Sequence, residues 1–468
     1  MTNYKVISTS KTKIIATLGP SSKDKNIIEK MIRNGARGFR INFSHGDQAQ
    51  WSDFVNTVRM LEQSMETPLA LIGDLQGPNI RLGNLPQQSV FIKKGMIYEV
   101  NLSQTSDDVN KIPVPTKEFF DKLVIGDTIQ VGDNMLSLKV TEKKENVVYT
   151  EALSSGEIKS RMSIRIKDKD IDVPYMTSKD KQDLLFAVKN NFSHIMISFV
   201  RTEKDVLCVK NTLKEVTEDP PRILAKIETR SAVEHLEEIV RASDGVVVAR
   251  GDLGKVFPLE YLPELQSRIV SVARRRGKPV YIATQLLTSM VDSPIPTRSE
   301  VVDVYVSVKE GVDGVMLTNE TSIGKYPAET VEWAKRIIDN AERNPEVNVY
   351  PEVEDLSWRF GRGIIELSTL LESPIIIYSL TGKAMRISSA YRPRYPLFIG
   401  SPNWSVLRDC AILYGCIPIH IDSNEYEEGL EKLKARLKEM EMLKEGTLTI
   451  SSYKFTHLDK QKITIEKI

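Results

Sequence analysis

Short runs of apolar, often β-branched residues that end in polar residues recur along the chain. Because these runs lack the alternation of a half-exposed strand, they predict strands that are buried on both faces. Eight such runs are present, at residues 13–20, 38–46, 68–78, 194–201, 222–228, 245–252, 278–285 and 314–320. Amphipathic segments with helical spacing separate most of them, as at residues 231–243 and 264–277. Eight alternations of strand and helix predict a (β/α)8 TIM barrel.

The alternation is interrupted once, after the third predicted strand. Residues 82–170 show strand-like runs and turn residues in place of a helix, and helical spacing returns at residues 178–191. We therefore expect the barrel to be formed by residues 1–81 and 171–340. The intervening residues predict a small β-barrel domain on a strand-to-helix loop, where it would act as a lid over the catalytic mouth.

A third unit is predicted from residue 341 to residue 468. Four apolar runs alternate there with amphipathic helical segments, which is typical of an open-sheet α/β domain. The expected fold class is therefore α/β, with a TIM barrel, an inserted small β-barrel lid domain and a C-terminal open-sheet α/β domain.

Composition and charge limit the classes of partner. The chain is 41% apolar and 27% charged, as expected for a water-soluble globular protein. Its net charge of +1 gives no basic excess for nucleic acid. Three irregularly spaced cysteines fit a reducing cytoplasm better than a disulfide framework or a thiolate metal site. No signal-like segment or membrane-length apolar run is evident, so we expect a cytoplasmic protein without a membrane partner.

Polar residues follow the predicted strands, and TIM-barrel active sites form where the strands end. In the run "ILAKIE", period-2 alternation places Lys226 and Glu228 on the same face. Asp252 follows the next strand, so two carboxylates and a cation are expected to meet. Oxygen ligands of this kind suit Mg²⁺ or Mn²⁺. Each motif alone is also common as an ion pair or a turn, but their occurrence on neighbouring strands favours a metal site.

The other side of the expected mouth carries groups that suit a phosphoryl substrate. Arg40 and Arg81 lie at or after the ends of the second and third strands, where two guanidinium groups would face the metal. The loop at residues 249–254 offers backbone N–H groups to an anion, and the Thr284 hydroxyl follows the next strand. As alternatives, Arg81 would be a surface charge at the lid hinge, and residues 44–46 a simple capped turn.

Other conspicuous residues are expected to have structural roles. The basic run at residues 273–277 predicts the C-terminal end of a helix, where cations favour the helix dipole and glycine favours the cap. The scattered histidines at positions 194, 235, 420 and 457 are assigned no chemistry.

Six segments occur in an order that identifies a family. They are "RINFSHG", "AKIE", "ARGDLG", "KPVYIATQLLTSM", "PTRSE" and "NETSIGKYP". With them the chain resembles pyruvate kinase over nearly its whole length. The resemblance implies transfer of the phosphoryl group of phosphoenolpyruvate to ADP, giving ATP and pyruvate in the last step of glycolysis. It also implies a homotetramer.

The resemblance assigns roles to the residues that follow the strands. It implies that Glu228 and Asp252 bind the catalytic Mg²⁺. Lys226 would stabilise charge on the phosphoryl group and then on the enolate, while Arg40 would hold the phosphoryl group from the other side.

The substrate carboxylate and the nucleotide are assigned in the same way. The backbone at Gly251 and Asp252 would hold the carboxylate together with the Thr284 hydroxyl, and protonation of enolpyruvate would run through Thr284 and ordered water. His45 and Arg81 match positions near the nucleotide phosphates. In the lid, "GDN" stands where two successive Asp residues are usual, which leaves Asp133 as the nucleotide-binding carboxylate.

The potassium site departs from the family pattern. Matching ligand positions are Asn42, Ser44, Asp74 and the backbone carbonyl of Leu75. Asn79 stands where K⁺-dependent members carry Glu and K⁺-independent members usually carry Lys. Because a neutral amide supplies neither charge, we expect K⁺ to be dispensable.

Two alternative functions share part of this pattern. Aldolases and lyases that handle pyruvate enolates also hold Mg²⁺ with Glu and Asp, but they have no need of Lys226, Arg40 or a nucleotide lid. A catalytically dead homologue that senses metabolites would usually have lost the metal ligands or the cation. All of these residues are present in this chain.

Overall fold

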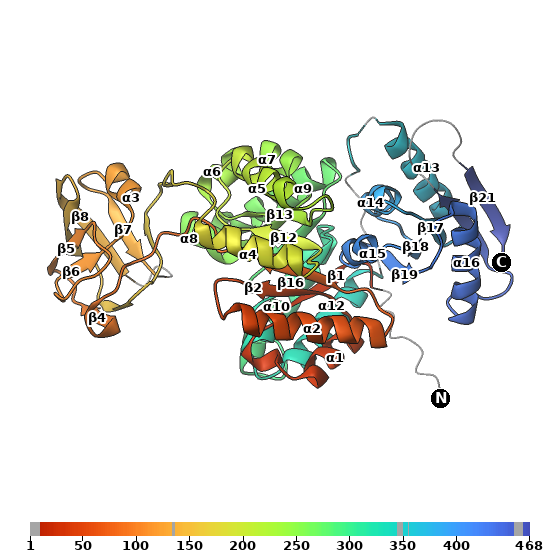
Figure 1. Ribbon diagram of the computed structural model, residues 1–468, viewed down its shortest axis with the longest axis horizontal. Coiled ribbons are helices and arrows are strands. Elements are labelled where there is room, and N and C mark those ends of the chain that lie inside the picture. Colours follow the sequence, from red (N-terminus) through yellow and green to blue (C-terminus); the bar gives the residue numbers. More distant parts are fainter. Residues whose placement is uncertain (1–9, 133–135, 344–349, 354, 454–461) are drawn as a thin grey trace.

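The centre of the molecule is a closed barrel of eight parallel strands (Figure 1). The computed structural model describes residues 10–132, 136–343, 350–353, 355–453 and 462–468. The barrel strands are β1 (Lys13–Thr17), β2 (Ala36–Asn42), β3 (Ala70–Asp74), β12 (His194–Ile197), β13 (Arg222–Ile227), β14 (Gly245–Ala249), β15 (Val280–Ala283) and β16 (Gly314–Leu317). Each corresponds to one of the predicted runs, so the predicted barrel is confirmed.

Helices connect the strands and surround the barrel (Figure 1). They are α1 (Lys25–Arg33), α2 (Gln48–Ser64), α4 (Ser178–Lys189), α5 (Glu203–Val216), α6 (Arg230–Glu234), α7 (Leu236–Ala242), α8 (Arg250–Val256), α9 (Leu262–Arg275), α10 (Arg298–Lys309), α11 (Asn319–Ser322) and α12 (Pro327–Ala341). Thr177 and Thr297 begin α4 and α10 with capping boxes that satisfy the first N–H groups. After α9, Gly277 takes a φ of +64°, which agrees with the predicted helix end.

The interior of the barrel is a packed apolar column. Met196, Leu224, Val247 and Tyr281 are buried there, and Ile412 of the C-terminal part of the chain joins the same cluster. The Tyr281 hydroxyl donates a hydrogen bond to the backbone oxygen of Ile412 at 3.1 Å. The C-terminal domain therefore closes the barrel at the N-terminal ends of its strands, which we call the floor.

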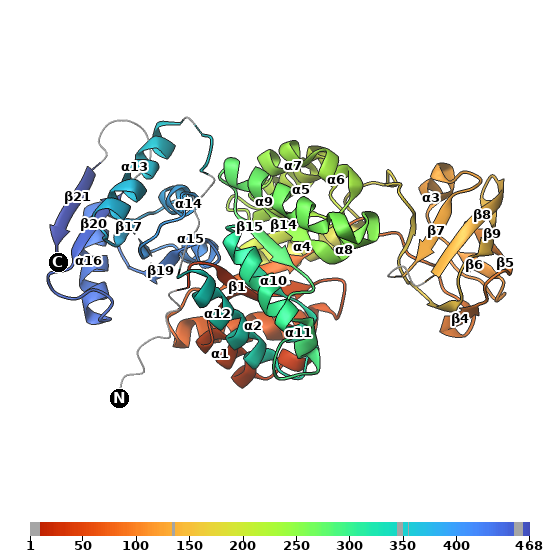
Figure 2. The same cartoon turned by 180° about the vertical axis from the view of Figure 1, so that it is seen from behind.

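The inserted segment forms a separate domain with its own core, on the far side of the barrel from the C-terminal domain (Figures 1 and 2). A six-stranded sheet has the order β11-β7-β8-β9-β5-β6, and β10 pairs with β4. The elements are β4 (Ser89–Ile92), β5 (Ile97–Asn101), β6 (Lys111–Pro113), α3 (Lys117–Lys122), β7 (Thr128–Val131), β8 (Leu136–Lys144), β9 (Val147–Ala152), β10 (Gly156–Lys159) and β11 (Ile164–Ile166). The curled sheet agrees with the predicted β lid, to which the structure adds one short helix.

The C-terminal domain is an open α/β sheet with the strand order β19-β18-β17-β20-β21. Its elements are α13 (Leu356–Leu370), β17 (Ile375–Tyr378), α14 (Lys383–Ala390), β18 (Leu397–Ser401), α15 (Trp404–Cys410), β19 (Cys416–His420), α16 (Tyr426–Glu439), β20 (Leu448–Tyr453) and β21 (Lys462–Lys467). The four predicted strands are present and parallel, and β21 adds an antiparallel edge. Half of the β21 residues are charged, so its sequence gives little strand signal. Among the described residues, no helix is both long and apolar enough to cross a membrane.

Candidate active site

A cavity of about 190 Å³ opens where the barrel strands end, and we call it the mouth cavity. Most of the barrel strands contribute residues to its lining, because parallel strands bring their carboxyl ends to one face of the barrel. The predicted site residues that line it are Arg40, Asn42, Ser44, Asp74, Lys226, Asp252 and Thr284. Residues spread over more than half of the chain thus meet in one place.

Lys226 and Glu228 form a buried ion pair at the end of β13. Lys226 Nζ lies 3.0 Å from Glu228 Oε2, which agrees with the predicted placement on one face of the strand. Glu228 Oε1 accepts a hydrogen bond from the Phe199 backbone N–H at 2.7 Å. Glu228 is 1% exposed, and among the described residues no group forms a well-directed hydrogen bond with its Oε2. This buried oxygen therefore contacts the Lys226 ammonium and keeps a lone pair for a further ligand.

The protonation states of Glu228, Lys226 and Asp252 depend on one another. Burial raises the pKa of Glu228 to about 7, the charge of Asp252 adds to this effect, and Lys226 opposes it. Burial alone would lower the pKa of Lys226, but Glu228, Asp74 and Asp252 outweigh burial and raise it above its ordinary value. Burial also disfavours the charge of Asp252, but Lys226 and Lys255 hold its pKa below the usual range. Two carboxylates on adjacent strands, one of them buried, suit a divalent cation.

The residues present fit Mg²⁺ or Mn²⁺. Glu228 and Asp252 follow the adjacent strands β13 and β14 and offer oxygen ligands alone. Across the described residues, no group of three or more His, Cys, Asp or Glu side chains forms a denser metal site. A two-carboxylate site of this kind leaves coordination positions for water and substrate, as is usual for Mg²⁺.

Arg40 is held rigidly at the edge of the mouth cavity. Its Nε and Nη2 donate to Asp74 Oδ2 at 2.9 and 2.5 Å, and its Nη1 donates to the Thr17 hydroxyl at 3.1 Å. The Arg40 side chain is 12% exposed, and its charge acts on Lys226. Two cations that are fixed before substrate binds can stabilise a transferring phosphoryl group without reorganising.

The first turn of α8, within the segment "ARGDLG", is hydrogen-bonded to Thr284. The Gly251 backbone N–H donates to Thr284 Oγ1 at 2.8 Å. Thr284 has a φ of +70°, which strains a β-branched residue by about 1–3 kcal/mol. Arg250 stabilises this conformation by donating to the backbone oxygens of Thr284 and Gln285 and by pairing with Asp303 at 2.7 Å. These contacts offset the strain and hold the hydroxyl in a fixed place within the mouth cavity.

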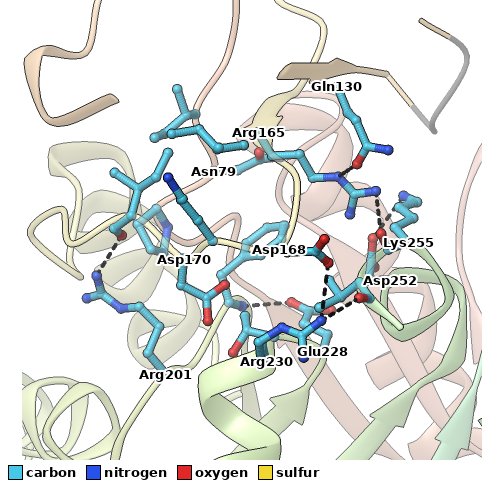
Figure 3. Close-up of a pocket in the computed structure, with 18 of the residues that line it drawn as sticks. Asn79, Gln130, Arg165, Asp168, Asp170, Arg201, Glu228, Arg230, Asp252 and Lys255 are labelled. Atoms are coloured by element: carbon cyan, nitrogen blue, oxygen red, sulfur yellow. Dashed lines mark hydrogen bonds and ion pairs between the residues drawn. The ribbon is translucent and has the colours of Figure 1, made fainter. Parts of the chain in front are cut away.

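A second cavity of about 120 Å³, the lid cavity, lies between the inserted domain and the mouth (Figure 3). It shares Asn79, Phe199 and Asp252 with the mouth cavity. Gln130, Arg165 and Asp168 of the inserted domain face Glu228, Arg230 and Lys255 of the barrel across it.

Polar contacts join the two sides of the lid cavity. Arg165 donates to Gln130 Oε1 at 3.1 Å and to the Lys255 backbone oxygen at 2.6 Å. Asp168 pairs with Arg230 at 3.2 Å. These residues were not among the predicted site residues, because their convergence depends on how the inserted domain docks. Ser198, whose hydroxyl accepts a hydrogen bond from Lys226 at 3.2 Å, was also missed, although it directly follows β12.

Two of the three predicted nucleotide-binding residues, His45 and Arg81, lie outside both cavities. Arg81 is half-buried and donates to the Arg161 backbone oxygen at 3.1 Å within the inserted domain. His45 is exposed, and its backbone oxygen accepts a hydrogen bond from Trp51. Neither side chain lines the mouth or the lid cavity. The prediction for Asp133 lies outside the described residues.

Three of the four predicted potassium ligands, Asn42, Asp74 and Leu75, carry oxygens that interact with donors of the protein. Asn42 Oδ1 accepts from the Ser44 backbone N–H at 3.0 Å, and the Leu75 backbone oxygen accepts from the Ser198 hydroxyl at 2.8 Å. One Asp74 oxygen accepts from Arg40, and the Ser198 hydroxyl, which has a single proton, lies within reach of both the Leu75 oxygen and the other Asp74 oxygen. The protein's own donors therefore occupy part of the hydrogen-bonding capacity of these oxygens.

Comparison with known proteins gives a consistent result. Residues 9–331 match the family model described as pyruvate kinase, barrel domain, and residues 368–456 match pyruvate kinase, alpha/beta domain. The chain is 36% identical to pyruvate kinase of Aeropyrum pernix over 91% of this chain and 92% of that protein. It is 38% identical to pyruvate kinase of Pyrobaculum aerophilum over 90% and 91%. The crystal structure of pyruvate kinase from Pyrobaculum aerophilum superimposes with a TM-score of 0.90 at 35% identity, covering 98% of this chain and 99% of that one. A pyruvate kinase structure from Cryptosporidium parvum gives 0.91 at 27% identity, with 99% and 97% coverage.

Proposed function

Because the chain belongs to the pyruvate kinase family and is a phosphotransferase, we propose that it transfers the phosphoryl group of phosphoenolpyruvate to ADP, giving ATP and pyruvate. The observation that carries this proposal is the convergence of Lys226, Arg40 and Asp252 on the mouth cavity, with Glu228 directly beside it. Neither an aldolase nor a lyase needs this pair of cations, and a sensor that has lost catalysis would not need to keep them.

Phosphoryl transfer depends mainly on positioning and on charge stabilisation. Arg40, held by Asp74 and Thr17, binds the phosphoryl oxygens from one side. Lys226, kept as an ammonium by its acidic neighbours, stabilises charge on the transferring group and then on the enolate oxygen. Both cations keep their positions through the step, so the protein supplies the stabilisation without reorganising.

Glu228 and Asp252 would hold Mg²⁺ or Mn²⁺. When bound, such an ion supplies a positive charge that stabilises developing negative charge on substrate oxygens. The protein's part is to present two carboxylates, one of them with an oxygen that no described group satisfies well.

The Thr284 hydroxyl lines the mouth cavity. Because its Oγ1 accepts the Gly251 N–H, its own O–H is left to donate into the mouth cavity. We propose that the hydroxyl and the backbone at Gly251 and Asp252 hold the carboxylate, and that protonation of enolpyruvate runs through Thr284 and ordered water.

The lid cavity is the site proposed for ADP. It adjoins the mouth cavity at Asp252, and Arg165, Arg230 and Lys255 line it, the last two in ion pairs with Asp168 and Asp252. The roles of His45, Arg81 and Asp133 at the nucleotide phosphates rest on the family resemblance.

Phosphorus NMR tests the proposed reaction directly. Purified protein is mixed with phosphoenolpyruvate, ADP and Mg²⁺, and we expect the ATP signals to grow as the phosphoenolpyruvate signal disappears. A parallel sample treated with a chelator should show no transfer. Persistence of both substrates in the complete mixture would contradict the proposal and reopen the lyase and sensor alternatives.

Potassium should not be needed for turnover. Asn42 and Asp74 already accept hydrogen bonds from the protein, and Asn79 brings no charge to the site. We expect similar rates in tetramethylammonium buffer before and after addition of KCl. A strict requirement for KCl would show instead that Asn42, Ser44 and Asp74 exchange these hydrogen bonds for the ion.

Three broader properties are proposed from the family alone. They are a homotetrameric assembly, a cytoplasmic location and a place in glycolysis. The net charge of +1 supports the absence of a nucleic-acid partner.

A further inference from the structure

Lys255 lies where the lid cavity meets the mouth cavity. It is in α8, three residues after Asp252, and it lines the lid cavity, whereas Asp252 lines both cavities. Lys255 Nζ lies 2.9 Å from Asp252 Oδ1 (Figure 3). This cation therefore approaches one of the two proposed metal ligands from the side on which ADP is proposed to bind.

The two lysines beside the proposed metal ligands differ in how firmly they are held. Lys226 lines the mouth cavity and pairs with Glu228, which is buried. The side chains of Lys255 and Asp252 are 27% and 30% exposed. Because an ion pair in contact with water contributes little stability, Lys255 can leave Asp252 at a small cost in free energy. Lys226 is expected to keep its place, and Lys255 is free to exchange its partner.

Other cations of the lid cavity pair with carboxylates that the metal does not need. These pairs are Lys169 with Asp127, Arg201 with Asp205, and Arg230 with Asp168. Lys255 differs from them, because its partner Asp252 is a proposed metal ligand. A divalent cation at Asp252 would take this carboxylate and would also repel the ammonium group. Lys255 is thus the cation that metal binding would displace.

The main chain at Lys255 is fixed by the inserted domain. Arg165 donates to the Lys255 backbone oxygen at 2.6 Å, and Arg165 also donates to Gln130 within the inserted domain. The lysine side chain is a flexible four-carbon stem that ends in three donors. Its ammonium group can therefore turn from Asp252 into the lid cavity while the backbone stays in place.

We propose that Lys255 exchanges partners during the reaction. It pairs with Asp252 until a divalent cation occupies that carboxylate, and it then binds a phosphate group of the nucleoside diphosphate in the lid cavity. An ammonium group is a common partner of phosphate in proteins. The inference rests on the function proposed above and deepens it, because it assigns Lys255 to nucleotide binding and makes that binding depend on the metal.

Binding of Mn²⁺ to the full-length protein without substrates tests the first half of the exchange. The electron paramagnetic resonance signal of free Mn²⁺ gives the Kd. We expect Lys255→Met to bind Mn²⁺ about 2- to 5-fold more tightly than the parent protein, because a weak ion pair no longer competes for Asp252. An unchanged or weaker affinity for Mn²⁺ would overturn the proposal.

Calorimetric titration with ADP, in saturating Mg²⁺, tests the second half. We expect Lys255→Met to bind ADP about 10-fold or more weakly, because a hydrogen bond between charged groups is lost. Lys255→Arg keeps a cation that can donate to phosphate and should restore most of the affinity. If Lys255→Met bound ADP as well as the parent does, Lys255 would be only a partner of Asp252 and the proposal would be wrong.

The opposite directions of the two shifts separate this role from a structural one. A variant that only loosened α8 would weaken both affinities, and that result would contradict the exchange. Lys335→Met is a matched control, since the Lys335 side chain is 28% exposed and pairs with Asp339 within α12 but lines neither cavity. It should change neither Kd. Lys255→Gln serves as the second variant if Lys255→Met does not fold.

These measurements also distinguish the exchange from the proposed reaction. If the parent protein forms ATP in the phosphorus NMR experiment but Lys255→Met moves neither affinity, the exchange is wrong and the proposed function stands. If the parent forms no ATP but the two affinities move in opposite directions, the exchange is supported and only the reaction assigned to the site is wrong.

Discussion

A Lys226→Met variant is expected to turn over about 100- to 1000-fold more slowly than the parent enzyme. Lys226 is buried against Glu228 and lines the mouth cavity, and its acidic neighbours keep it charged. Methionine nearly preserves the length of the side chain but removes the charge that stabilises the transferring phosphoryl group and the enolate. The loss should appear in kcat, measured with saturating phosphoenolpyruvate and ADP, because this stabilisation is greatest in the transition state.

A matched control tests whether the loss is specific to the site. Lys434 is also a largely buried lysine that pairs with Glu431 at 2.7 Å, but it lies in the C-terminal domain. Lys434→Met should retain turnover, and circular dichroism should show that both variants are folded. A Lys226→Met enzyme with near-parental kcat would contradict the role assigned to this residue, and an effect confined to KM would limit Lys226 to binding the substrate.

The second large effect is expected on stability. Arg392→Met should reduce the free energy of unfolding by about 3–5 kcal/mol, because it leaves the buried Asp313 carboxylate without its cation. The two side chains are 5% and 4% exposed and form a bidentate pair. Denaturation in urea, followed by circular dichroism, measures the change.

A double variant separates the unpaired charge from lost packing. In Arg392→Met/Asp313→Asn the charge is removed from both partners, while the amide oxygen can still accept the hydrogen bond that the Val280 N–H now gives to Asp313 at 2.9 Å. We expect it to regain much of the stability lost in the single variant. Equal stability of the single and double variants would show that the cost comes from packing instead.

The barrel could be predicted because its strands are buried on both faces and so leave uninterrupted apolar runs. The pairing of Lys226 with Glu228 was also predictable, since the period of a strand places residues i and i+2 together. Both features depend on residues that are close in the sequence. The charged edge strand β21 depends on its pairing with β20, and its own residues gave too little signal to predict it.

The parts of the site that could not be predicted depend on distant contacts. Arg250 is fixed by Asp303, and the backbone strain at Thr284 exists because this contact holds it. The approach of Arg165 to the Lys255 backbone likewise follows from the docking of the inserted domain. The spacing of residues within one strand or loop does not predict such contacts.

The closure of the barrel floor has a mechanical consequence. Ile412 extends the barrel's interior column, and Tyr281 and Asp313 are bonded across the same junction, so the barrel and the C-terminal domain are expected to move as one body. The inserted domain has a separate core and meets the barrel through polar contacts beside the mouth. The C-terminal domain is thus expected to stay fixed to the barrel while the inserted domain moves. Opening for substrate exchange would then be confined to the mouth, where the chemistry takes place.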